Sequence, residues 1–198
     1  MSMLDGVSQC WWLSKSCAVN WNAWAAIGTV AAVFAAIFGP SLQRMLIRRK
    51  ANALFAFAFR GDVITVLVKL ASIRDQFPIE KGHGAAWAAQ ELLRKDESAR
   101  TDFMARARSL DVLTKRDLDM SKWPAVDLDL AAKLARAMES VRHFQMGAEV
   151  LATPEGDRDW ELMFGTIDDA LREALAYIDL AERALMEALV AMPKSRRK

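Results

Sequence analysis

The sequence predicts an all-α protein: one N-terminal transmembrane helix followed by a cytoplasmic up-down four-helix bundle. Residues 23–39 contain no charged side chain, as expected of a segment that crosses a bilayer. In the rest of the chain, apolar residues recur at steps of three and four, which is the spacing of amphipathic helices. No segment shows the alternation of apolar and polar residues that is typical of a strand. The expected divisions are a short extracytoplasmic tail (1–20), a transmembrane helix (21–40), a cytoplasmic helical bundle (41–192) and a basic tail (193–198).

The composition favours a folded domain with a packed core. Of the 198 residues, 53% are hydrophobic and 26% are charged, which argues against a disordered chain. The formal net charge is only +2, which argues against a general nucleic-acid binder driven by bulk charge. The basic residues are clustered, however, beside the apolar segment and at the end of the sequence.

Charge placement around the apolar segment predicts its orientation. Four cations follow it: Arg44, Arg48, Arg49 and Lys50. The charged side chains of the first 20 residues are only Asp5 and Lys15. Tryptophans are frequent at that end of the segment, as is typical of residues that anchor a helix at the membrane interface. The positive-inside rule then places the N-terminus outside and the bundle in the cytoplasm, at the inner membrane of a bacterium. A secretory signal peptide carries its positive charge before the apolar segment, so the reversed flanks favour an uncleaved anchor.

Small residues in the span predict self-association. They recur at four-residue spacing in two ladders, Gly28, Ala32 and Ala36, and Ala31, Ala35 and Gly39. Such ladders let helix backbones approach closely in lipid, where packing drives association. A homo-oligomer is therefore expected, and two forms remain open. The span is either a plain anchor or part of a pore gated by apolar residues, with Asn20 and Asn22 at its outer mouth.

Residues 41–77 are expected to form the first helix of the bundle. Pro40 follows Gly39, which predicts a kink or a break after the span. The segment resembles a second membrane helix, but the charges of Arg60, Asp62 and Lys69 would be costly in a bilayer. The inward stripe is expected to contain Phe55, Phe59, Val63, Val66, Leu70, Ile73 and Phe77.

Three more helices are expected, over residues 85–110, 127–152 and 159–192. They are separated by a turn rich in glycine and proline, by a polar loop broken at Pro124, and by a second turn after 152. Asp127 is the expected cap of the third helix. The residues of that helix expected to face inward are Leu130, Leu134, Met138, Val141, Gln145 and Ala148.

The last helix has the clearest pattern. Large residues recur every seven positions, and a second series recurs three positions later: Phe164, Leu171, Ile178, Leu185 and Met192, then Ile167, Ala174, Ala181 and Ala188. This pattern predicts close antiparallel or coiled-coil packing. In an up-down bundle the basic tail, including Arg196 and Arg197, returns towards the anionic inner leaflet near Arg44, or else serves only to solubilise the chain.

Few residues offer catalytic or metal-binding chemistry. The sequence has no glycine-rich phosphate loop, no nucleophile elbow and no paired-cysteine metal motif, so no cofactor and no metal are expected. The histidines are His83, in a turn, and His143, in the third helix. Cys10 and Cys17 lie before the span, and whether they form a disulfide within or between chains is open.

Arg136 and His143 form the one candidate catalytic pair. Seven residues are nearly two helical turns, so both point the same way, opposite the inward stripe, on a face that also carries Ala132, Met146 and Val150. An arginine and a histidine at this spacing, late in a helical bundle behind a membrane helix, resemble HEPN domains and the membrane accessory proteins of type VI-B CRISPR systems. The resemblance implies a ribonuclease in which the pairs of two protomers meet across a dimer interface, with RNA as substrate.

Taken together, the residues favour a non-enzymatic, single-pass inner-membrane protein. It would self-associate through the span and the last helix, and act as an interaction or membrane-perturbing module in defence, stress or signalling. Its expected partners are membrane lipid, further copies of itself and a partner protein. A membrane-tethered HEPN-like ribonuclease using Arg136 and His143 is one alternative, and an oligomeric pore is the other.

Overall fold

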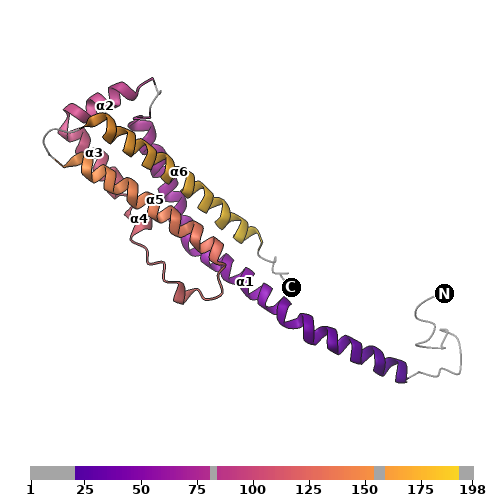
Figure 1. The fold of residues 1–198 in the computed structure, drawn as a ribbon. Helices are drawn as coiled ribbons and strands as arrows, with labels where there is room; N and C mark the ends of the chain where they lie inside the picture. The colour runs from indigo at the N-terminus through magenta and orange to yellow at the C-terminus, as the bar shows by residue number, and fades with distance from the viewer. Residues whose placement is uncertain (1–20, 81–83, 154–158, 192–198) are drawn as a thin grey trace, which may run out of the picture. The chain divides into compact units, whose positions relative to one another are not determined.

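The computed structural model describes residues 21–80, 84–153 and 159–191, and this part of the chain is helical without any strand. The helices are shown in Figure 1. Their bounds are α1 (Trp21–Gln76), α2 (Ala86–Lys95), α3 (Glu97–Arg108), α4 (Asp111–Thr114), the 3₁₀ turn η1 (Met120–Lys122), α5 (Leu128–Ala152) and α6 (Trp160–Val190). The chain divides into two compact units after Ile47.

Helix α1 continues through Pro40. The sequence predicts a kink or a break at this position, and the break is absent, because α1 is helical from Trp21 to Gln76 with Pro40 inside it. A proline in a helix interior removes one backbone hydrogen bond, here to the Ala36 carbonyl, and clashes with that turn. Helices that cross membranes tolerate such a residue. The cost is confined to one turn of a helix that is 56 residues long.

The second unit has one hydrophobic core, to which α1, α2, α3, α5 and α6 all contribute. The stripe predicted on the first bundle helix is confirmed, since each of its seven members is buried. On α5, five of the six residues expected to face inward are buried, and Gln145 is half-buried. The repeat of α6 is also buried as far as the structure describes it, from Phe164 to Leu185, with Ala188 half-buried.

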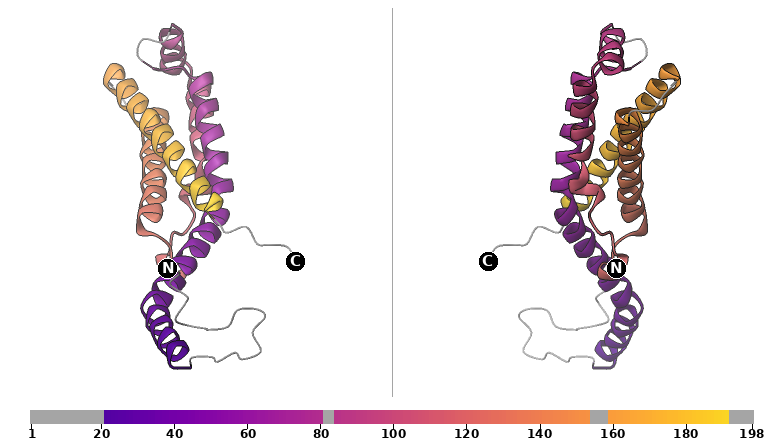
Figure 2. Two further views of the ribbon diagram at one scale, coloured as in Figure 1. Left: turned by 90° about the vertical axis from the view of Figure 1, so that its right-hand side faces the viewer. Right: turned by 90° about the vertical axis from the view of Figure 1, so that its left-hand side faces the viewer.

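Helices α5 and α6 form an antiparallel pair (Figure 2). Small residues at their contact allow the close approach. A Cβ added to Gly147 would lie 3.3 Å from Cγ1 of Ile167, and the α6 residues Ala174 and Ala181 are buried. Both helices begin with an aspartate cap. The Asp127 carboxylate accepts a hydrogen bond from the amide of Asp129 (3.0 Å), as the sequence predicts, and Asp159 accepts one from the amide of Leu162 (3.0 Å).

The expected helix over 85–110 is in fact two helices. Asp96 has an extended backbone (φ −105°, ψ 112°), which ends α2, and its carboxylate accepts a hydrogen bond from the amide of Ser98 (2.8 Å), which begins α3. The prediction of one helix is wrong, because Asp96 acts as an N-cap inside an otherwise helical pattern. The division leaves Trp87 exposed on α2 while Phe103 on α3 is fully buried.

Charged residues on α1 bind other segments of the second unit. Arg60 contacts Glu182 of α6 (3.3 Å), and Lys69 donates to the carbonyl of Ser109 (2.7 Å). On the opposite flank of α1, Arg116 donates to Asp62 (2.7 Å). These three charges therefore connect α1 to the segments that pack against it.

Candidate functional site

The first unit contains the candidate membrane anchor. Within the described residues, α1 is the helix that is long and apolar enough to cross a membrane, and its most apolar window has a mean hydropathy of 1.9. None of that window is buried within the chain. A core helix of a soluble domain would instead be mostly covered. The hydroxyl of Thr29 donates to the carbonyl of Ala25 (2.8 Å), which satisfies this polar group inside the helix.

The small-residue ladders lie on open helix surface. Of their six members all are exposed except Gly39, which is half-buried. A Cβ added to Gly28 would meet no atom within 4 Å. Nothing in the described chain covers these positions, so they are accessible to another helix.

The four cations after the span are also exposed. Arg44, Arg48, Arg49 and Lys50 form no ion pair or hydrogen bond with any described side chain. They occupy one stretch of seven residues in α1. Their charges are therefore exposed and unpaired within the described part of the chain. Arg196 and Arg197, the other predicted membrane-surface residues, lie outside the described residues.

Arg136 and His143 are both exposed on α5. The guanidinium carbon of Arg136 lies 4.4 Å from the ring centroid of Tyr177 on α6, a cation–π contact. His143 forms no hydrogen bond or ion pair with the described residues. The surface around the pair includes the exposed Met146, as the helical wheel predicts. Arg136 is thus used in the contact between α5 and α6, a role that the sequence pattern did not indicate.

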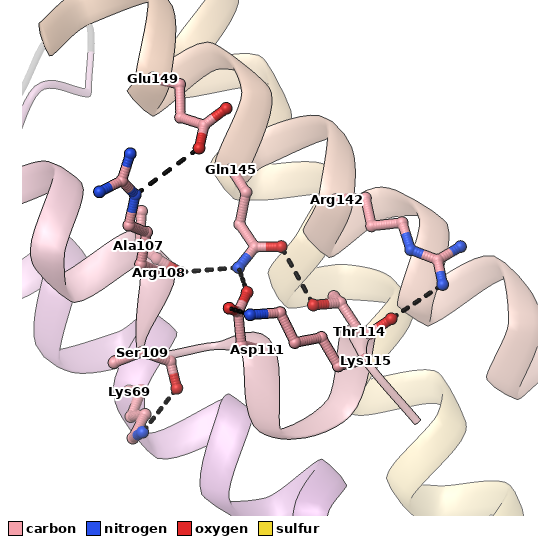
Figure 3. Close-up of polar contacts among 10 residues, drawn as sticks. All are labelled: Lys69, Ala107, Arg108, Ser109, Asp111, Thr114, Lys115, Arg142, Gln145 and Glu149. Atoms are coloured by element: carbon pink, nitrogen blue, oxygen red, sulfur yellow. Dashed lines mark hydrogen bonds and ion pairs between the residues drawn. The ribbon is translucent and has the colours of Figure 1, made fainter. Parts of the chain in front are cut away.

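A polar network joins α5 to the ends of α3 and α4 (Figure 3). At its centre, Nε2 of Gln145 donates to the carbonyl of Ala107 (2.9 Å) and to Oδ1 of Asp111 (2.9 Å). The Thr114 hydroxyl donates to Oε1 of Gln145 (3.2 Å). Ala107 lies in the last turn of α3, where carbonyls lack partners within the helix. The amide of Leu110 also donates to this carbonyl (3.1 Å), so the Gln145 side chain adds a second hydrogen bond and caps α3 from a neighbouring helix.

The same network contains charged residues along an open hollow. Arg142 donates to the carbonyl of Thr114 (2.9 Å), and Arg108 forms an ion pair with Glu149 (3.6 Å). The ammonium of Lys115 holds the pKa of Asp111 below its ordinary value; burial opposes this effect, and the Gln145 amide adds to it. The hollow is lined by seven residues: Arg108, Asp111, Lys115, Arg142, Gln145, Met146 and Glu149. Both acidic groups of the hollow are paired with basic groups, Asp111 with Lys115 and Glu149 with Arg108. The network therefore holds neighbouring helices together.

Gln145→Leu is expected to lower the free energy of unfolding by about 1–3 kcal/mol, because the change leaves the hydroxyl of the buried Thr114 without its hydrogen bond and removes one from the carbonyl of Ala107. The full-length protein in detergent micelles would be unfolded with urea and followed by far-UV circular dichroism. The matched control is Met146→Leu, at the exposed next position, with an expected change below about 0.5 kcal/mol. Equal effects of the two variants would contradict a capping role for Gln145.

Comparisons with known proteins give no relative: no family model, no curated protein and no solved structure matches this chain.

Proposed function

We propose that this is a single-pass inner-membrane protein that self-associates through its span and presents a cytoplasmic four-helix bundle as an interaction module. The observation that carries the proposal is the uncharged, uncovered segment of α1 with its ladders of small residues. This helix surface has no partner within the part of the chain that the structure describes. In lipid, close contact between small residues is a common basis of helix association.

The exposed cations support the proposed orientation. Unpaired basic side chains directly after a span favour the cytoplasmic side and attract anionic lipid, with a contribution of about 1 kcal/mol per cation near the surface. Under this proposal the second unit lies in the cytoplasm. Its tightly packed core then serves to hold the helices together, and its exposed faces serve to bind partners.

The last helix does not contribute to self-association in this proposal. Its repeat, from Phe164 to Leu185, is buried within the core of the same chain. Residues already covered by α5 and α1 cannot also form a seam between copies unless the core opens. The sequence-based expectation of an intermolecular role for this helix is therefore replaced by an intramolecular one, and the span carries the association.

Full-length protein is expected to be oligomeric in mild detergent, and Gly28→Leu combined with Ala32→Leu is expected to weaken association about tenfold. The larger side chains hold the backbones of neighbouring copies apart, while within the described chain Gly28 has open space around it and Ala32 is exposed. Mass photometry over a dilution series would measure the change. Val30→Leu, at an exposed position of the same helix away from both ladders, is expected to associate like wild type. A strictly monomeric wild type would refute the proposal.

A further inference from the structure

The part of α1 that lies in the second unit is apolar on two opposite faces. One face is the buried stripe from Phe55 to Phe77. The other carries residues that the chain leaves exposed: Leu54 is 58% exposed, Phe57 79% and Val68 63%. Large apolar side chains gathered on one exposed face usually mark a site of interaction. The second face is therefore a surface without its partner in the described chain.

The spacing of this second face is that of a coiled-coil seam. Leu54, Gly61 and Val68 are seven residues apart, and Phe57, Ile64 and Ala71 follow each of them by three. These are the a and d positions of a heptad repeat, whose natural partner is another helix with the same period. Lys50 occupies the preceding d position and Asp75 the next a position, so charges limit the seam to residues 54–71. At 1.5 Å per residue this is about 27 Å of helix.

The charges beside the seam are held away from it. Arg60 turns to Glu182 on one flank, and Asp62 is bound by Arg116 on the other. In a parallel pair of helices, the g position Arg60 faces the e position Thr65 of the second copy, so no like charges meet. The side chain of Phe57 would insert among residues that include Ala58 and Gly61 of the other helix. These small residues leave room for a large ring.

We propose that residues 54–71 of α1 form a parallel seam with the same residues of a second copy. This inference rests on the proposed function, because a shared membrane span gives all copies the same polarity and a high effective concentration. A seam of this length would be marginal between two separate helices. The shared span removes that difficulty, because the two helices are already folded and close together when they meet. The cytoplasmic part of α1 would thereby extend the contact that begins in the membrane.

Cysteine crosslinking of the full-length chain in membranes tests the seam. In a background with Cys10→Ser and Cys17→Ser, Gly61→Cys is introduced alone, at a position where an added Cβ meets no atom within 4 Å. Mild oxidation is expected to give a covalent dimer. The matched control is Leu162→Cys on α6, which is 69% exposed and outside the seam, so a clearly lower dimer yield is expected. Equal yields, or no dimer from Gly61→Cys, would overturn the proposal.

A second set of variants separates the seam from the span. Ala32→Cys reports on contact in the membrane, so a dimer there without one at Gly61→Cys would refute the seam and leave the proposed function standing. Failure of both would refute both. Phe57→Lys added to Gly61→Cys is expected to abolish the crosslink, while Leu128→Lys, at a similarly exposed position (77%), is expected to preserve it. A crosslink to a different protein, or protection of Gly61→Cys from maleimide by lipid without any crosslink, would also overturn the seam.

Discussion

Phe103→Ala is expected to be the most damaging single change in the second unit, with a loss of about 3–5 kcal/mol in the free energy of unfolding. Phe103 on α3 is fully buried. Its ring meets Phe77 edge-on at 5.2 Å between centroids and Phe144 of α5 edge-on at 5.9 Å. Removing it leaves a cavity where α3, α5 and the end of α1 meet. Pairs of this geometry add about 0.5–1.5 kcal/mol beyond burial.

Urea unfolding of the full-length chain in detergent micelles, followed by far-UV circular dichroism, measures the loss. Leu128→Ala is the control, because Leu128 is 77% exposed at the start of α5 and its truncation should change stability by less than about 0.5 kcal/mol. A loss below about 1 kcal/mol for Phe103→Ala would mean that the three rings do not form the junction described.

The buried faces could be predicted from the sequence because they depend on local periodicity. The stripe from Phe55 to Phe77 follows directly from helical spacing, and so does the inward face of α5. The cap at Asp127 was also predictable, since a short acidic side chain before an apolar repeat is a helix-start signal. Such features need only the residues within a few turns of each other.

Other features depended on a choice between local signals. Pro40 favoured a break, but α1 retains its helix around the proline. Asp96 is an N-cap that divides the expected helix over 85–110. The apolar pattern on either side of it favours one continuous helix. In each case two local rules disagreed, and only the folded chain shows which one prevails.

The polar contacts were beyond prediction because they join distant segments. The sequence predicts that Gln145 faces inward. A polar residue within an apolar stripe indicates that its side chain has a specific hydrogen-bond partner. The identity of that partner, the end of α3, depends on tertiary packing. The contact of Arg136 with Tyr177 is of the same kind, since the two residues lie on different helices. Sequence spacing could place Arg136 on a face of α5 but not beside a ring of α6.

Neutralising the cations after the span is expected to change the orientation of the whole protein. The variant replaces Arg44, Arg48, Arg49 and Lys50 with Gln and adds two lysines to the tail by Ser8→Lys and Gln9→Lys. The positive-inside rule depends on basic residues close to the ends of a span, so reversing this difference should reverse the preferred insertion. The four cations are exposed and make no ion pair with the described residues, so their loss should leave the fold intact.

The two natural cysteines report the orientation directly, because Cys10 and Cys17 both precede the span. In spheroplasts treated with a reductant, a membrane-impermeant maleimide is expected to label the wild type without lysis, and the neutralised variant only after lysis. A matched control replaces four cations far from the span with Gln and should be labelled like wild type: Lys95, Arg106, Lys115 and Lys133. Wild-type cysteines that react only after lysis would place the N-terminus inside, and the second unit would then face away from the cytoplasm. That result would overturn the proposed orientation while leaving the seam on α1 open to its own test, because a parallel pair requires only that all copies share one polarity.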